Sequence, residues 1–277
     1  MKFKVFKSLL LVIVMLLSNF SSAEEEPAVQ IDWKRGPATY QVANKANIFT
    51  PEEYVFLGTD ETDKYLRMSQ NIPDGTRHFF GPINDKWDAY LSFDPVGYVE
   101  DKEDLNSDSL LQDAIGGQKE SNKERRKKKW DTLTVLGWEF EPQYDKSNNL
   151  LEWAFLIKND TTEEKLVNYE TRILGRNGVM KVTLVTAPDD LHASVLDFKE
   201  KIRGFKFNSG EKYSEYREGD RVAEFGLAAL ITGGAAALAS KKGFWAAIVA
   251  FFIAAKKLVL VAAIGFFAWI VSFFRRK

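Results

Sequence analysis

The strongest constraint on this chain is its C-terminal sequence, where residues 258–274 carry no charged side chain. As a helix rising about 1.5 Å per residue, this segment spans roughly 25 Å, slightly less than the ~30 Å hydrocarbon core of a bilayer. Lys256, Lys257 and Arg275 flank it, and their long side chains can reach the interface from either end. The sequence therefore predicts a membrane span at residues 258–274, with the terminal Arg275-Arg276-Lys277 in the cytoplasm.

A second interpretation places more of the C-terminal region, residues 222–277, in the membrane. Residues 222–240 are rich in Ala and Gly, and Ala229, Gly233 and Ala237 form a small-residue stripe that lets helices approach closely. Residues 243–255 reach only about 20 Å as a helix, which is too short for an ordinary span. In this interpretation residues 222–240 cross the membrane first, residues 243–255 form a short return and residues 258–274 cross last, which gives three spans. One span and three spans both place the C-terminus in the cytoplasm. A helix lying on the membrane surface is a further interpretation of residues 222–240.

The N-terminus has the layout of an export signal. Lys2, Lys4 and Lys7 precede an apolar run at residues 9–17, and Ser21 and Ala23 supply the small residues of a cleavage site. The apolar run is short for a membrane span, so we expect residues 1–23 to be a cleaved signal peptide rather than an uncleaved anchor.

Charge is distributed unevenly along the chain. Residues 1–23 and 225–277 contain no acidic residue, whereas residues 24–224 hold 28 basic and 39 acidic side chains. An acidic body between basic, apolar ends is typical of a membrane-anchored topology and argues against nucleic acid as a partner. The chain has no cysteine, which excludes disulfides, thiolate metal sites and lipoprotein attachment.

The body, residues 24–221, is long enough for one sizeable core and predicts an α+β fold on a mostly antiparallel sheet. Strands are expected at residues 54–57 and 87–93, and in two hairpins that pair 133–140 with 150–157 and 167–174 with 179–185. Asn177-Gly178 in the second hairpin predicts a tight turn with positive φ. Three helices are expected at residues 61–70, 107–129 and 189–203, the second capped by Ser107 or Asp108.

Residues for chemistry are scarce. His78 and His192 are the only histidines, and no nucleophile elbow, phosphate loop or zinc-ligand spacing accompanies them. The acidic stretch 100–108 fits a calcium loop at its first positions, but Ser109 stands where Gly is required and Ile115 where the bidentate Glu is required. We therefore predict no catalytic, cofactor-binding or metal-ligating residue and no cofactor.

Two charged sets allow functional and structural interpretations. Residues 119–129 hold seven basic side chains and either attract anionic lipid headgroups or form the solvated end of a helix. Glu152, Trp153, Arg172 and Arg176 lie on neighbouring predicted strands, where an Arg–carboxylate pair would bind a ligand or brace the sheet. Bracing and the solvated helix end are the simpler interpretations.

Seven ordered motifs carry a family resemblance. They are 54–57 (YVFL), 96–99 (VGYV), 137–138 (GW) with Pro142 and 144–145 (YD), 151–154 (LEWA), 167–169 (VNY), 172–179 (RILGRNGV), and 219–223 (GDRVA) with 226–227 (GL). Together they resemble the bacterial family known as domain of unknown function 2167, over about residue 31 to the C-terminus. Gln143 stands where many members carry His. The resemblance implies an exported body with a C-terminal membrane anchor, and it implies no activity and no catalytic residue.

These features predict a non-enzymatic envelope protein in the inner membrane of a bacterium, with its body in the periplasm. The body would bind membrane lipids or a partner protein of the envelope, and a homo-oligomer is left open. The alternative is a membrane-anchored hydrolase or transferase that uses carboxylates, since Asp and Glu pairs need neither His nor Cys. A pocket with two carboxylates would favour the enzyme, and a groove with an apolar patch would favour the binding protein.

Overall fold

A computed structural model describes residues 30–102 and 105–232 of the chain. The predicted signal peptide, the stripe residues Gly233 and Ala237, and the predicted span at 258–274 lie outside this part. Within the described residues, no helix is both long enough and apolar enough to cross a membrane.

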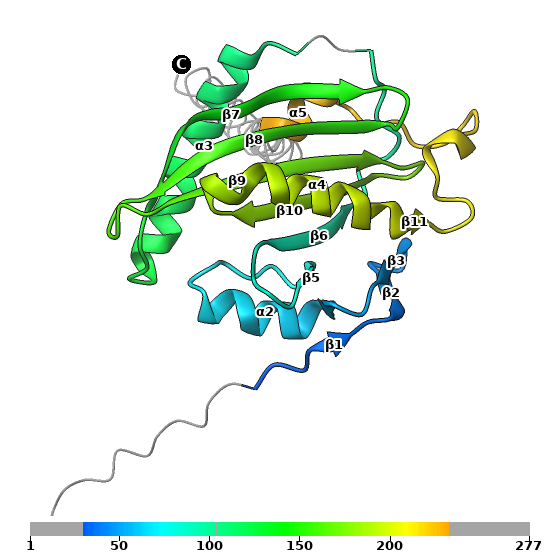
Figure 1. Ribbon diagram of the computed structural model, residues 1–277. Coiled ribbons are helices and arrows are strands. Elements are labelled where there is room, and N and C mark those ends of the chain that lie inside the picture. Colours follow the sequence, from blue (N-terminus) through cyan, green and yellow to red (C-terminus); the bar gives the residue numbers. More distant parts are fainter. Residues whose placement is uncertain (1–29, 103–104, 233–277) are drawn as a thin grey trace, which may run out of the picture. The chain divides into compact units, whose positions relative to one another are not determined.

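Two antiparallel sheets form the body (Figure 1). The large sheet has the strand order β1-β4-β5-β6-β10-β9-β8-β7, and the small sheet has the order β11-β3-β2. The strands are β1 (Lys34–Arg35), β2 (Ala38–Val42), β3 (Ala46–Thr50), β4 (Tyr54–Leu57), β5 (His78–Pro82), β6 (Asp88–Asp94), β7 (Leu133–Asp145), β8 (Leu150–Asn159), β9 (Lys165–Leu174), β10 (Val179–Thr186) and β11 (Phe205–Phe207).

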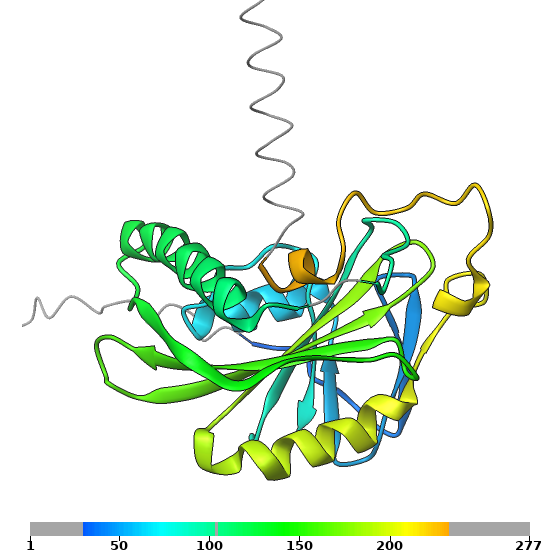
Figure 2. The same cartoon turned by 90° about the horizontal axis from the view of Figure 1, so that it is seen from above.

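Helices lie on both faces of the large sheet. In Figure 2, α2 (Thr59–Met68, cyan), α3 (Ser107–Lys127, green) and α5 (Leu227–Thr232, orange) are on one side, and α4 (Leu191–Lys201, yellow-green) is on the other. Side chains alternate between the two faces along each strand. On β8, Trp153 points to the α3 face and packs near α3 and α5, whereas Ala154 points to the α4 face and packs near Phe198 of α4.

The α+β class and the three predicted helices are confirmed, with two corrections. Helix α3 is capped one residue before the predicted caps, because the Asn106 side chain accepts a hydrogen bond from the Ser109 N–H at 3.0 Å. The structure also adds a fourth helix, α5, within the predicted C-terminal region. Leu227, Leu230 and Ile231 are buried in the same core cluster as Leu110 of α3, so this start of the region packs on the body.

The predicted strands are present, and the structure adds β1, β2, β3, β5 and β11. Strand β7 also continues through Pro142 to Asp145, beyond the predicted end at residue 140. It lies at the edge of the large sheet and pairs only with β8, with register shifts between Val135 and Gly137, between Trp138 and Phe140, and between Phe140 and Gln143. The edge strand is therefore repeatedly bulged.

The hairpin of β9 and β10 is confirmed, but the predicted turn is wrong. Leu174 pairs with Val179, so four residues connect the strands, and neither Asn177 nor Gly178 has positive φ. A Cβ atom on Gly178 would lie 2.2 Å from the carbonyl oxygen of Asp94 on the neighbouring strand. Glycine is therefore required here for close backbone approach.

The turn with successive positive φ values instead joins β2 to β3. Ala43 and Asn44 adopt φ of 51° and 56°, and the Lys45 N–H donates to the Val42 carbonyl at 3.0 Å. Two successive residues with positive φ are the requirement of a type I′ turn. Asn44 tolerates this conformation well, but the sequence around it lacks the glycine that makes such turns easy to recognise.

Candidate functional site

A polar cleft of about 550 Å³ lies on the α3 face of the large sheet. Strands β6, β10 and β9 form its floor, the end of α2 and the following loop form one wall, and β8 with the start of β7 forms the other. We call it the sheet cleft. Its lining residues are Leu66, Ser69, Asn71, Asp74, Arg77, Asp88, Tyr90, Ser92, Leu133, Ile157, Asn159, Leu166, Asn168, Glu170, Arg172, Lys181, Thr183 and Val185.

Strand register explains why the floor of the sheet cleft is polar. Thr183 of β10 pairs with Tyr90 on one side and with Glu170 on the other, which makes a row across three strands. Lys181 pairs in the same way with Ser92 and Arg172. Because side chains alternate with a period of two, both rows point to the same face. This part of the antiparallel sheet thus carries polar side chains, as is usual for a face that is not packed on a core.

Asp88 lies at the α2 end of the sheet cleft and accepts hydrogen bonds from two tyrosines. The Tyr65 hydroxyl donates to its carboxylate at 3.0 Å and the Tyr90 hydroxyl at 3.2 Å. Burial raises the pKa of Asp88 above its ordinary value, although the two hydroxyls oppose this shift and Asp85 adds to it. Burial also raises the pKa values of both tyrosines, so their hydroxyls remain protonated donors.

Glu170 is held at the centre of the cleft floor. The Thr183 hydroxyl donates to both of its carboxylate oxygens, at 3.0 and 2.9 Å, and Nη1 of Arg172 donates at 2.8 Å. The Arg172 guanidinium stacks over the Trp153 ring, with 4.6 Å from Cζ to the ring centroid. Two carboxylates of the cleft, Glu170 and Asp74, therefore have an arginine partner, Arg172 and Arg77 respectively. Among the described residues, Asp88 is bound only by hydroxyls.

Of the predicted polar set on the hairpins, the structure brings together Trp153 and Arg172 but not Glu152 or Arg176. Glu152 pairs with Thr171 and points to the α4 face, where it accepts hydrogen bonds from Lys199 Nζ at 2.9 Å and from the Tyr169 hydroxyl. Arg172 points to the opposite face, beside Trp153. Arg176 lies in the loop after β9 and makes two hydrogen bonds of 2.7 Å to Asp220. Glu152, Arg172 and Arg176 therefore each take part in a different stabilising contact.

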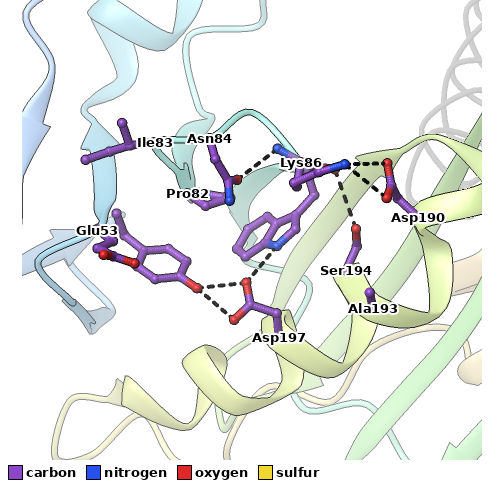
Figure 3. Close-up of a pocket in the computed structure, with 11 residues that line it drawn as sticks. Glu53, Pro82, Ile83, Asn84, Lys86, Asp190, Ala193, Ser194 and Asp197 are labelled. Atoms are coloured by element: carbon purple, nitrogen blue, oxygen red, sulfur yellow. Dashed lines mark hydrogen bonds and ion pairs between the residues drawn. The ribbon is translucent and has the colours of Figure 1, made fainter.

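A second hollow, of about 650 Å³, runs along α4 (Figure 3). Asp197 of α4 accepts hydrogen bonds from the Tyr54 hydroxyl at 2.7 Å and from Trp87 Nε1 at 3.0 Å, which connects the helix to β4 and to the start of β6. Lys86 Nζ lies 3.2 Å from Asp190. Ser194 shares a 2.9 Å hydrogen bond with the Thr186 hydroxyl. These polar groups hold α4 on the sheet, so we interpret this hollow as part of the packing between the helix and the sheet.

The remaining candidates from the sequence are spread over the body. His78 is buried against Phe56, which lowers its pKa, and His192 is exposed on α4. In the acidic stretch, Asp101 accepts a hydrogen bond from the Tyr144 hydroxyl at 3.4 Å, while residues 103 and 104 lie outside the described part. In the basic segment, Arg125 is buried and donates to the Asp131 carbonyl. The solvated-helix interpretation therefore fits its exposed lysines better than it fits Arg125.

Sequence reasoning missed the sheet cleft and its residue Asp88. A signal was present, because polar residues recur with a period of two on three strands. They are Asp88, Tyr90 and Ser92 on β6, Glu170 and Arg172 on β9, and Lys181 and Thr183 on β10. Such alternation marks a half-buried strand. Recognising one shared surface also requires the strand order, which places β10 between β6 and β9.

Comparisons with known proteins confirm the resemblance noted in the sequence. Residues 34–266 match the family described as "Protein of unknown function (DUF2167)". No curated protein matches the chain. The solved structures that are similar at low identity include the following two. Cyanobacterial PsbP (CyanoP) from Synechocystis sp. PCC 6803 is 8% identical with a TM-score of 0.37, and covers 66% of this chain and 96% of its own.

The Ran-binding protein Mog1p from Saccharomyces cerevisiae is 11% identical, also with a TM-score of 0.37, and covers 68% of this chain and 100% of its own. At these TM-scores the similarity carries no information on function.

Proposed function

We propose a function for this chain, which belongs to the DUF2167 family of proteins of unknown function: it is a non-enzymatic, exported domain anchored in the inner membrane of a bacterium. The body lies in the periplasm and binds a partner protein or lipid near the membrane through the sheet cleft. The C-terminal segment is the anchor and ends in the cytoplasm.

The observation that carries this proposal is the position of α5. Its residues Leu227, Leu230 and Ile231 are buried beside α3, on the same face of the large sheet as the cleft. The chain then continues into the apolar sequence of residues 233–274. An anchor that starts from this face keeps the sheet cleft close to the membrane. The Glu170 carboxylate suits binding better than proton transfer, because its oxygens are already bound by Arg172 and by the Thr183 hydroxyl.

Cysteine labelling tests the topology in the full chain, which has no native cysteine. We expect Ser147→Cys, in the exposed loop between β7 and β8, to react with a membrane-impermeant maleimide once the outer membrane is permeabilised. Lys277→Cys should react only after lysis. Ser194→Cys, at a buried position, should react only after denaturation and serves as the control. Labelling of Lys277→Cys in cells with an intact inner membrane would refute every odd number of spans.

The same labelling chemistry tests binding through the cleft. In cells, a photocrosslinker attached at Asn71→Cys, on the cleft wall, should capture a partner or lipid. The same crosslinker at Ser147→Cys should not capture it. Identical products from both positions, identified by mass spectrometry, would show that the cleft is not the binding surface.

One observation favours the alternative, a carboxylate-based hydrolase or transferase. Asp88 is a carboxyl with a raised pKa in a cleft, and such groups are typical of general acids. Because the pKa of Asp88 is raised, the folded protein binds this proton more tightly than the unfolded chain does. The contribution of the Asp88 proton to the free energy of unfolding is therefore complete below the unfolded pKa of about 3.9. It is lost as the pH rises through the higher pKa of the folded state.

We therefore expect Asp88→Asn to raise the Tm of the protein at pH 7, because the asparagine stays neutral and can still accept from Tyr65 or Tyr90. The difference from the unmodified chain should shrink as the pH falls toward 4. Asp113→Asn, at an exposed position of α3, is the control and should leave the Tm unchanged at both pH values. A lower Tm for Asp88→Asn at pH 7 would assign Asp88 to structure and remove this support for an enzyme.

A further inference from the structure

Ser92, Lys181 and Arg172 form a row of donors across the floor of the sheet cleft. They lie on β6, β10 and β9 as direct cross-strand neighbours, and all three side chains line the cleft. Directly opposed side chains on antiparallel strands have Cβ atoms about 4.5–5.5 Å apart, and like charges at this spacing repel. The sheet thus places an ammonium and a guanidinium side by side.

Each of these two cations has one carboxylate partner, Glu170 for Arg172 and Asp94 for Lys181, but these contacts leave several of their N–H donors unused. Lys181 Nζ lies 3.6 Å from Asp94, which is an ion-pair distance but too long for a hydrogen bond. Among the described residues, the Lys181 ammonium has no hydrogen-bond acceptor. Glu170, the partner of Arg172, is at the same time bound by the Thr183 hydroxyl. The ammonium therefore has all three donors available.

Arg172 is buried, with 9% of its surface exposed, and is fixed in place. Its Nη1 donates to Glu170 and to the Thr171 carbonyl, and its plane stacks on Trp153. In the described part of the protein its Nη2 makes no hydrogen bond, and its Nε is also unpaired but is itself shielded from solvent. A buried guanidinium that is rigid but incompletely satisfied is suited to a ligand that accepts hydrogen bonds.

The third member of the row, Ser92, has 8% of its surface exposed. Among the residues that the structure describes, its hydroxyl has no hydrogen-bond partner either. The row therefore offers a hydroxyl, an ammonium and a guanidinium, none of them fully used, within the span of three strands. Unused donors on two cationic side chains suit an oxyanion, which would compete with Glu170 and Asp94 for them.

We propose that the Ser92–Lys181–Arg172 row binds the phosphate group of a ligand. The phosphate belongs either to a lipid headgroup or to a small soluble molecule, and the row recognises the same chemistry in both. The row lies next to the core cluster that contains α5. Val179 is two residues before Lys181 on β10, so the two side chains point to the same face, and Val179 packs in that cluster. This inference adds a ligand class to the proposed function, and only the lipid source depends on the membrane location.

Calorimetry on the full chain in uncharged detergent tests the row with two probes, inorganic phosphate and dihexanoyl-phosphatidylglycerol. We expect saturable binding of at least one probe. Lys181→Gln should weaken it roughly tenfold or more, because a charge-assisted hydrogen bond is lost. Lys64→Gln is the matched control, since the Lys64 side chain has 44% of its surface exposed against 41% for Lys181 and lies on α2 outside the cleft. It should leave binding unchanged.

Arg172→Lys tests the guanidinium separately. It keeps the positive charge but loses the planar fork, so binding should weaken while circular dichroism shows an intact fold. Binding of inorganic phosphate identifies a soluble source, and binding of the short-chain lipid alone identifies a headgroup. Equal affinities of the unmodified chain and Lys181→Gln, or no saturable binding of either probe, would overturn the proposal. These results do not depend on the labelling experiment, so the two proposals can fail separately.

Discussion

Replacing Phe198 by alanine is expected to lower the free energy of unfolding by about 3–5 kcal/mol, the usual cost of removing a buried aromatic ring. Phe198 anchors α4 to the large sheet, with 1% of its surface exposed. Its ring meets Trp87 and Tyr169 edge to face, with centroid distances of 5.8 and 6.2 Å. The alanine variant would leave a cavity between the helix and the sheet, because neighbouring strands cannot close it.

Leu196→Ala is the control on the same helix. Leu196 has 58% of its surface exposed, so its truncation should change the free energy of unfolding by no more than about 0.5 kcal/mol. Urea unfolding of the full chain in detergent, followed by tryptophan fluorescence, measures both variants. Similar losses for the two variants would mean that Phe198 does not anchor α4.

Replacing Gly178 by alanine is expected to cost about 3 kcal/mol, at the upper end of the usual cost of overpacking. The added Cβ would lie 2.2 Å from the carbonyl oxygen of Asp94 and 2.7 Å from the Phe93 ring. A carbonyl in a strand cannot move aside as a flexible side chain can, so the pairing of β6 with β10 has to shift. Gly137→Ala is the control, because a Cβ there meets no atom within 4 Å.

An asparagine variant separates this explanation from a turn with positive φ. Asparagine tolerates positive φ, so Gly178→Asn would be mild in a type I′ turn. If the contact with the Asp94 carbonyl is the cause, Gly178→Asn should lower the stability at least as much as Gly178→Ala. Thermal unfolding of the two variants and the control decides between the explanations. A mild Gly178→Asn together with a harmful Gly178→Ala would contradict the close-approach explanation.

The sequence was informative about strands that combine β-branched or aromatic residues with a recognisable turn. The hairpin of β9 and β10 was predicted for this reason, although its turn chemistry was not. Strand β5 was missed because His78–Pro82 has no alternation and is buried along its whole length. A helix was expected within residues 222–240, but its packing on the body was not, because an apolar, Ala-rich sequence suits both a membrane and a protein core.

The candidate site was less predictable because it depends on strand register. Glu152 and Arg172 were expected to be neighbours, but Glu152 is opposite Thr171, and a difference of one residue places Arg172 on the other face. The sheet cleft requires in addition that β10, distant in sequence from β6, pair with it. Local patterns give the polarity of each strand and do not give this long-range pairing.

The irregular β7 edge limits how copies of this protein can associate. A straight edge strand with free backbone groups can pair with the edge strand of another copy and join the two sheets. Three register shifts, and Pro142, which has no N–H to donate, interrupt this edge. Glu139 and Glu141 are exposed on it and would bring like charges together. The β7 edge is thus protected from pairing with a strand of another copy, and a homo-oligomer would have to form through other surfaces.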